Sequence, residues 1–196
     1  IFNTKYVLAN QATATDVAIQ GNVTPVISNL GARSASGQTY PALFTVASVQ
    51  PPVLAVTQVN PPNRPAERPH KDTLTNLQKS GECVVNVASS AQLELMNACA
   101  GDYPPDVSEF DAAGIERAPS VHVAVPGVAI APVRYECRLR QILPVASNPM
   151  GGTMMLLDVV AIHVHESVEA NGEISLAQHR TLGKMGGDGY SVAKED

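Results

Sequence analysis

The sequence contains no tryptophan, and only 4% of its residues are aromatic. Aromatic rings are the platforms on which nucleic-acid bases stack, so this composition provides few such platforms. Acidic residues outnumber basic residues by 18 to 13, and the formal net charge is -5. Because nucleic-acid binders usually carry a basic face, the two shortages together exclude a general nucleic-acid-binding protein. Any anionic ligand must be held by local groups.

Long apolar runs are also missing, since none approaches the length of about 18 residues that predicts a membrane span. The chain shows no basic-then-apolar leader, which predicts no signal peptide. The cysteines Cys83, Cys99 and Cys137 are widely spaced, lie in apolar stretches and form no C-x-x-C pair. This pattern favours reduced, unreactive thiols in a cytoplasmic protein over a disulfide scaffold.

Three common nucleotide-binding and catalytic motifs are absent. The glycine-rich segment GKMGGDG (183–189) lacks the spacing of a P-loop, no G-x-G-x-x-G opens a helix after a strand, and no G-x-S-x-G marks a nucleophile elbow. A P-loop enzyme, a Rossmann domain and an α/β-hydrolase are therefore not supported. The glycines of 183–189 indicate either backbone that approaches a ligand closely or a plain surface turn.

What is present is the composition of one globular domain over residues 1–196, with 44% hydrophobic and 16% charged residues. Short runs typical of strands come first, at 24–30, 42–49 and 53–59. The pair Pro51-Pro52 separates the second run from the third, because proline cannot donate to a strand ladder. A further strand is expected at 83–88.

Helices are expected between these strands. One begins at Lys71 or Asp72, carries a short stripe of leucines and ends at Gly81, a natural helix stop. A second helix over 89–100 opens with Ser89 and Gln92 at capping-box spacing, and a third is expected within 104–114.

The clearest pattern lies in the segment VRYECRLRQ (133–141), where apolar and charged residues alternate strictly. Such alternation predicts a half-buried strand with a charged outer face. The apolar members are Val133, Tyr135, Cys137 and Leu139, and the charged members are Arg134, Glu136, Arg138 and Arg140. The three arginines of this strand either contact a phosphate or are solvated and paired across strands.

Turn residues at 147–153 and an apolar run at 154–166 follow, so the two strands form an antiparallel hairpin. Strands first, helices in the middle and a long hairpin last favour a single antiparallel β-barrel decorated by helices. A parallel α/β sheet would require regular alternation of strands and helices, which the sequence lacks.

Two histidines, His163 and His165, lie two residues apart on the last expected strand and so point to the same face. Two imidazoles on one face can begin a zinc site, but no third or fourth ligand is evident. We interpret them as polar residues at a strand end and predict no metal site.

The segment PPNRPAERPHKDTLTN (61–76) places prolines and basic residues directly before a helix start. A helix N-terminus presents N–H groups and partial positive charge, and these groups together with Lys71 and Thr73 suit a phosphate. The alternative interpretation is a proline-stiffened loop in which Asp72 caps the helix.

The order of several segments resembles a known family. The segments are YPALFTVASVQPP, HKDTLTNLQKSGECVVNV, DVSEFDAAGIERAPS, APVRYECRLRQI and LGKMGGDGY. Together they resemble the flavin reductase-like, FMN-binding split-barrel proteins, and the last segment is similar to the closing element of their flavoredoxin-type branch. Two features depart from the family pattern: the 60–70 loop is longer and richer in proline, and Tyr40-Pro41 stands where an Asn-x-x-Pro stretch is common.

This resemblance implies a mainly β fold with inserted helices, a six-stranded antiparallel split β-barrel that binds FMN near the interface of a homodimer. It implies that one strand and turn run along the isoalloxazine edge: Phe44, Thr45, Val46, Ala47 and Ser48. Lys71, Asp72 and Thr73 match the segment beside the ribityl phosphate. Gly186, Gly187 and Tyr190 are expected close to the flavin or to the mouth of its pocket.

The resemblance also implies an NAD(P)H-dependent flavin reductase that passes hydride from the nicotinamide to the flavin N5. Reduced FMN then goes to a substrate, a partner oxygenase or another electron acceptor. Two alternatives stay open from the sequence. One is an FMN-binding electron-transfer module without nicotinamide activity, and the other is a barrel that has lost FMN and binds a partner protein.

Overall fold

The computed structural model describes residues 4–7, 26–27, 42–60, 70–99, 103, 107–170, 173–184 and 190–192. Its strands are β1 (Thr4–Val7), β2 (Val26–Ile27), β3 (Ala42–Ser48), β4 (Val53–Val59), β5 (Glu82–Val87), β6 (Arg117–Ala118), β7 (Gly127–Val128), β8 (Val133–Pro144), β9 (Gly152–His165), β10 (Glu169–Ala170), β11 (Glu173–Ile174), β12 (Leu182–Lys184) and β13 (Tyr190–Val192). Its helices are α1 (Asp72–Ser80), α2 (Leu93–Ala98), α3 (Glu109–Ala112) and α4 (Leu176–His179), with 3-10 turns η1 (Ser90–Gln92) and η2 (Glu166–Val168).

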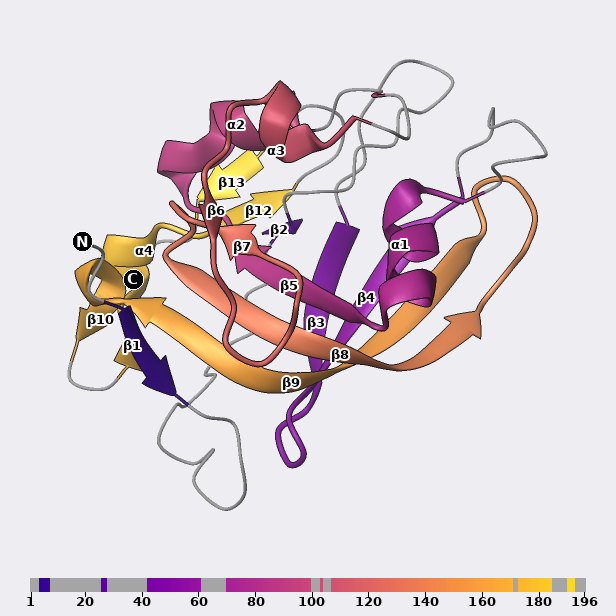
Figure 1. Ribbon diagram of the computed structural model, residues 1–196, viewed down its shortest axis with the longest axis horizontal. Coiled ribbons are helices and arrows are strands. Elements are labelled where there is room, and N and C mark those ends of the chain that lie inside the picture. Colours follow the sequence, from indigo (N-terminus) through magenta and orange to yellow (C-terminus); the bar gives the residue numbers. More distant parts are fainter. Residues whose placement is uncertain are drawn as a thin grey trace.

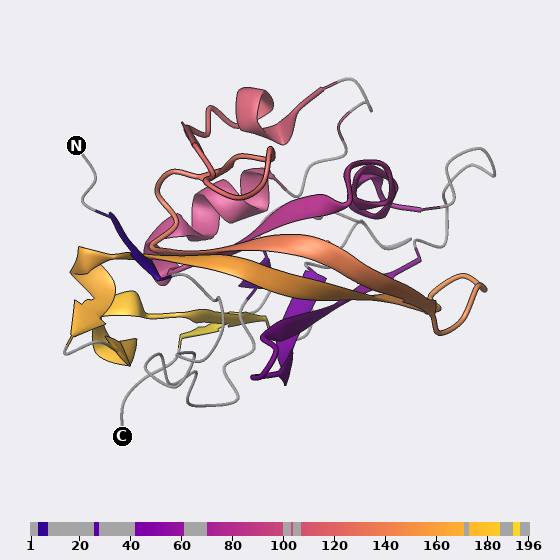
Figure 2. The same ribbon diagram turned by 60° about the horizontal axis from the view of Figure 1, so that its bottom comes forward.

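Antiparallel pairing arranges the main strands in a circuit. It joins β9 to β4, β4 to β3, β3 to β2, β2 to β5, β5 to β8, and β8 back to β9. The strand β1 pairs with the C-terminal end of β9. Figure 1 shows β8 and β9 as the longest strands, with α1 near one end of the pair and α2 and α3 near the other. In Figure 2 these helices lie on one side of the β8–β9 ribbons, and the pair β12–β13 lies on the other. The expected mainly β fold with inserted helices is confirmed.

The core is formed by the inward faces of these strands together with one face of α1. Phe44 from β3 and Leu54 from β4 pack in the same buried cluster as Leu74 and Leu77 from α1. These two leucines are the stripe expected for this helix. It ends where the sequence predicts, since Gly81 has a left-handed φ of 69° and donates its N–H to the carbonyl of Leu77 at 2.9 Å.

Most local predictions are confirmed within two residues of their expected ends. The strands at 42–48 and 53–59 flank the two prolines, and β5 follows directly after Gly81. At the capping box, the side-chain oxygen of Gln92 accepts the Ser89 N–H at 2.8 Å, but a 3-10 turn precedes the short helix α2. The third helix is shorter than expected and covers only Glu109–Ala112.

The predicted hairpin of β8 and β9 is present and is closed by a tightly built turn. The side-chain amide of Asn60, just after β4, donates to the carbonyl of Ala146 at 3.0 Å. A Cβ on Gly151 would lie 2.4 Å from the same carbonyl oxygen, so no side chain fits at this position. Asn60 therefore joins the end of β4 to the tip of the hairpin.

The predicted charged outer face of β8 is wrong at two positions. Arg134 is 8% exposed and Glu136 is fully buried, because segment 120–128 covers this part of the strand. Beyond the covered part, cross-strand pairing is confirmed. Arg138 lies 3.7 Å from the carboxylate of Glu82, and Arg140 lies 2.7 Å from that of Asp158.

None of the helices in the described ranges has the length and apolar character required to cross a membrane.

Candidate functional site

The start of α1 places a buried lysine at a helix N-terminus. Lys71 directly precedes the first helical residue, has an extended backbone, and its side chain is 2% exposed. The N–H groups of Leu74 and Thr75 donate to the Lys71 carbonyl at 3.1 and 3.3 Å. Lysine is rarely buried to this extent. The fold thus places an amine-bearing side chain at the helix end where the dipole is positive, and such an end favours an anion.

The structure tests one part of the two interpretations of the segment before α1. Asp72 is the first helical residue, and Lys71 is the N-cap, whose own side chain forms no capping hydrogen bond. The expectation that Asp72 occupies the cap position is therefore wrong, whereas the stiff loop and the phosphate site stay predictions. Thr73 is partly buried in the first turn. Residues 61–69, which include Arg64 and Arg68, lie outside the described residues.

The strand β3 alternates between the core and the surface. Phe44 is 4% exposed and contacts Tyr135 edge-on with ring centroids 6.1 Å apart. Thr45 and Ala47 are exposed, whereas Val46 packs against the core and Ser48 is partly buried. The outer surface of β3 therefore carries small side chains, over which a flat ring system can approach the backbone closely.

One backbone edge of β3 is largely open in the described part of the chain. β4 pairs along β3 from Leu43 to Ser48, whereas β2 pairs only with Ala42 and Leu43. Along the β2 side, residues 44–48 thus have no strand partner among the described residues. An open strand edge presents N–H and C=O groups in a row, and such groups suit the polar edge of a planar heterocycle.

The core connects these two predicted parts of the site, because Phe44 of β3 and Leu74 of α1 belong to one buried cluster. Inside the fold, β4 adds a polar group that the sequence does not reveal. Gln58 is 1% exposed, and neither atom of its side-chain amide finds a hydrogen-bond partner in the part of the chain that the structure describes. Such a buried amide is unusual and requires a ligand, water or rearrangement to satisfy it.

The structure places Tyr190 against α2. Its hydroxyl donates to the side-chain oxygen of Asn97 at 3.0 Å, and its ring packs on a small cluster that contains Met96 and Leu182. Gly186 and Gly187 lie outside the described residues. The expected role of these three residues near a flavin stays a prediction.

A polar centre that sequence reasoning missed lies on the outer face of β8. The carboxylate of Glu136 accepts the backbone N–H groups of Val121, His122 and Val123 at 2.7, 2.6 and 3.1 Å. The Nε2 atom of His163 on β9 lies 2.5 Å from the same carboxylate. Three successive N–H groups and an imidazole thus converge on one fully buried side chain.

The hydrogen bonds of this centre determine its charge. Burial raises the pKa of Glu136, but the N–H groups of Val121 and His122 and the ring of His163 outweigh it, so the pKa lies below its ordinary value. Burial lowers the pKa of His163, which the neighbouring Glu136 opposes only in part. At neutral pH, Glu136 is therefore ionised, and a neutral His163 donates its Nε2–H to it.

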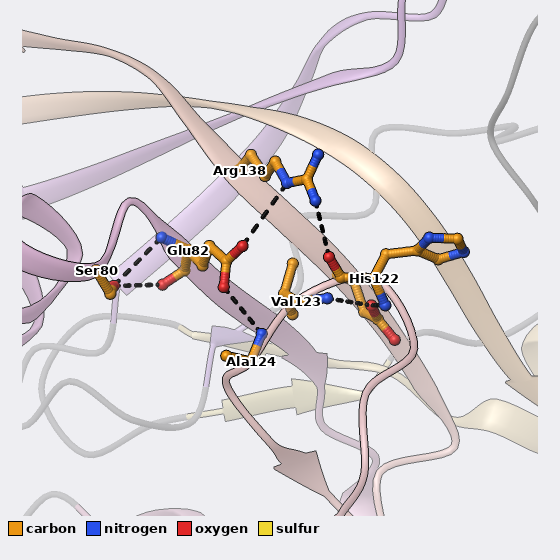
Figure 3. A network of polar contacts seen from close by, with 7 residues as sticks. Ser80, Glu82, His122, Val123, Ala124 and Arg138 are labelled. Carbon is orange, nitrogen blue, oxygen red and sulfur yellow. Dashed lines mark hydrogen bonds and ion pairs between the residues drawn. The ribbon is translucent and has the colours of Figure 1, made fainter.

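Further side chains hold the same segment on the outer face of β5. Glu82 accepts the Ala124 N–H at 2.9 Å, and Asn86 accepts the Val128 N–H at 2.9 Å. Figure 3 shows Arg138 reaching from Glu82 to the carbonyl of His122, to which it donates at 2.9 Å. We call residues 120–128, held by these side chains, the outer strap. Its role is to cover the sheet, and it contains no residue predicted for the flavin site.

The two strand histidines do not form a metal site with their neighbours. His163 is 3% exposed and contacts Glu136, whereas the Nδ1 atom of His165 accepts the Ser167 N–H at 3.1 Å. Within the described residues, no group of three or more histidine, cysteine or acidic side chains is arranged to hold a metal ion.

A third histidine is expected to make folding sensitive to acid. His179 is 1% exposed, its Nδ1 atom lies 2.6 Å from the hydroxyl of Thr181, and burial lowers its pKa to about 4. The unfolded chain therefore binds the proton more readily between pH 6.5 and 4, so stability falls as the pH falls through this range. Between pH 8 and pH 5 the loss from this residue is about 2 kcal/mol.

Urea denaturation of the wild type and of His179→Gln at pH 8 and pH 5 tests this expectation. The substituted protein should lose less stability on acidification, whereas the exposed-site control His122→Gln should behave like the wild type. An equal loss in all three proteins would show that His179 is not the group responsible.

A circuit of antiparallel strands, inserted helices and a buried lysine at the start of α1 together define a small, mainly β protein. Residues 19–183 match the family described as "Flavin reductase like domain", and the chain belongs to this family. The resemblance inferred from the sequence is thereby confirmed.

The chain is similar to several known proteins. An uncharacterized protein of Aquifex aeolicus (strain VF5) is 31% identical over 153 residues, which cover 78% of this chain and 74% of the relative. The crystal structure of nitrilotriacetate monooxygenase component B from Bacillus cereus has 25% identity and a TM-score of 0.72, with 97% of this chain and 96% of that chain covered. The FMN-binding domain of a flavin reductase-like enzyme from Shewanella baltica OS155 has 17% identity and a TM-score of 0.69, with 100% and 96% covered, and shares the fold.

Proposed function

We propose that the protein binds FMN and acts as an NAD(P)H-dependent flavin reductase. The observation that carries this proposal is the buried Lys71 at the start of α1, in a chain of the flavin reductase-like family. A phosphate carries the negative charge that this position favours.

The residues of the site fit FMN in two ways. Lys71, the hydroxyl of Thr73 and the first N–H groups of α1 would hold the phosphate. The backbone edge at 44–48, which has no strand partner on the β2 side among the described residues, would hold the polar edge of the isoalloxazine, with Thr45 and Ala47 small enough to permit close approach. Gly186, Gly187 and Tyr190 complete the proposed site at its mouth.

When bound, FMN would supply the acceptor for a hydride from the nicotinamide, and the chain would supply binding and orientation. Hydride transfer of this kind requires no acid or base from the protein. The groups assigned here accordingly bind and position, and none is assigned as a proton donor.

The proposal extends to assembly. We infer a single domain over residues 1–196, whose strand circuit is a six-stranded antiparallel split barrel, and a homodimer in the cytoplasm. The similarity to nitrilotriacetate monooxygenase component B supports a partner oxygenase as the receiver of reduced flavin, and the FMN-binding domain of Shewanella baltica supports FMN.

Titrating the protein into FMN is expected to quench the flavin fluorescence to saturation, and NADH or NADPH should then be oxidised in the presence of FMN. Riboflavin lacks the phosphate and therefore its charge-assisted hydrogen bonds, so its affinity should be lower than that of FMN by about tenfold or more. Absence of FMN binding would overturn the proposal. Binding without oxidation of either nicotinamide would favour the electron-transfer module instead.

A further inference from the structure

Two cysteines that lie far apart in the sequence are brought face to face by strand pairing. Cys83 on β5 is the direct register partner of Cys137 on β8. Both side chains point to the inner face: Cys137 is fully buried in the main core cluster, and Cys83 packs against that cluster while remaining partly exposed. Both are free thiols in this structure.

The Cα separation at this pair lies within the range that disulfides bridge. The Leu139 N–H donates to the Gly81 carbonyl at 2.8 Å, two residues along the same ladder. Because hydrogen-bonded pairs recur at every second residue of an antiparallel ladder, Cys83 and Cys137 also form such a pair, with Cα atoms about 5.5 Å apart. Disulfides bridge Cα separations of roughly 4.4–6.8 Å.

The surroundings distinguish the two thiols. Burial raises the pKa of Cys137 well above its ordinary value, and the thiol of Cys83, within hydrogen-bonding reach, raises it further. Cys83 is the member that an oxidant from solution can reach. The third cysteine, Cys99, packs in a separate cluster with Ile115 and Val128, and burial raises its pKa to about 11.

We propose that Cys83 and Cys137 form a reversible intramolecular disulfide when the folded protein meets a peroxide. The sulfur of Cys83 attacks the peroxide, which breaks the O–O bond and gives a sulfenic acid and water when the peroxide is hydrogen peroxide. The sulfur of Cys137 then attacks the Cys83 sulfur, loses its proton and expels a second water. Two thiols and one hydrogen peroxide thus give one disulfide and two waters, and the two sulfurs supply the two electrons.

The position of the pair makes this bond labile. Disulfides across hydrogen-bonded strand pairs must draw their Cβ atoms together against the spacing of the ladder, and strained disulfides are reduced more easily. The bond would fasten β5 to β8 two residues from Gly81, where α1 ends. The inference does not depend on the proposed flavin chemistry, because the peroxide is supplied from solution.

Peptide mapping tests the proposal on the full chain. Reduced protein is freed of reductant, treated with hydrogen peroxide, blocked with iodoacetamide and cleaved after glutamate. This cleavage separates all three cysteines into peptides 83–94, 95–109 and 137–166. Peptides 83–94 and 137–166 are expected as one linked species that dithiothreitol separates, and the titratable thiols should fall by two per chain.

Three comparisons make the outcome decisive. Cys99→Ser should form the same link, Cys83→Ser should form none, and protein oxidised in concentrated urea should link its cysteines without preference. Cys83 is partly exposed, so its serine variant is expected to fold even if Cys137→Ser does not. Overoxidised Cys83 without a link, a link between two chains, or a link to Cys99 in the folded protein would overturn the proposal.

Discussion

Replacing Glu136 with alanine is expected to lower the free energy of unfolding by about 3–5 kcal/mol, because the change leaves three backbone N–H groups and the buried ring of His163 without their acceptor. The carboxylate accepts three successive N–H groups of the outer strap and lies 2.5 Å from the ring of His163. No other side chain among the described residues accepts the N–H groups of Val121, His122 and Val123, so the strap loses its main attachment to β8.

Urea denaturation at pH 7 measures this effect. Glu136→Gln keeps the volume but presents an NH₂ group to the N–H donors, and it should cost an intermediate amount. Glu82→Gln is the matched control: Glu82 is a partly exposed acid on the neighbouring strand that accepts a single strap N–H, from Ala124. Its expected cost is about 1 kcal/mol or less.

Amide hydrogen exchange distinguishes loss of this centre from a general loss of packing. In Glu136→Gln, exchange at Val121, His122 and Val123 should accelerate more than exchange at Val128, which donates to Asn86. Uniform acceleration along the strap, or an unchanged unfolding free energy, would contradict the assignment.

The contribution of this centre to folding stability depends on pH. The pKa of Glu136 in the folded protein lies below its value in the unfolded chain. Its contribution to stability is therefore present in full above the unfolded pKa of about 4.3 and is lost as the pH falls through the folded pKa. This range lies mostly below the range assigned to His179, so the two residues affect different parts of the stability curve.

The elements that the sequence predicts well are those fixed by local chemistry. Proline cannot donate to a ladder, so the pair Pro51-Pro52 separates β3 from β4 whatever surrounds them. Gly81 adopts a left-handed φ of 69°, which few residues other than glycine accept, so α1 ends there. The alternation over 133–140 assigns Val133, Tyr135, Cys137 and Leu139 to the core face of β8.

Alternation does not show what covers a face, and this is why Glu136 was missed. Its partners come from the outer strap, 13 to 15 residues earlier, and from β9, 27 residues later. The apolar character of the strap was the available signal: a segment such as VHVAVPGVA (121–129), without an expected pairing partner, must dock its N–H groups somewhere. Likewise, Cys83 and Cys137 are paired by strand register. The two residues are 54 positions apart, so no C-x-x-C motif predicts their contact.

The proposed flavin site was predicted by resemblance more than by physical pattern. Local chemistry alone favoured a stiff loop with Asp72 as the cap, and the structure shows Lys71 at that position instead. The burial of Lys71 and Gln58 depends on packing between distant segments, so no sequence motif predicts it.

Replacing Lys71 with alanine is expected to weaken FMN binding by roughly 10- to 100-fold, because a charge-assisted contact with the phosphate is worth about 1.5–3 kcal/mol. Lys71 is 2% exposed, so alanine also leaves a small void. Lys71→Met separates the two effects, since methionine fills most of the space without the charge, and it should weaken FMN binding to a similar extent. The measurement is fluorescence titration of FMN at fixed ionic strength.

Riboflavin gives this prediction its sharpest control. It lacks the phosphate, so its affinity should change little in Lys71→Met if Lys71 contacts the phosphate and not the ring. Lys79→Ala, an exposed lysine in the last turn of the same helix, should leave the affinity for both flavins unchanged. Equal losses of affinity for FMN and riboflavin would show that Lys71 does not contact the phosphate. An unchanged affinity for FMN would show that the start of α1 is not part of the site.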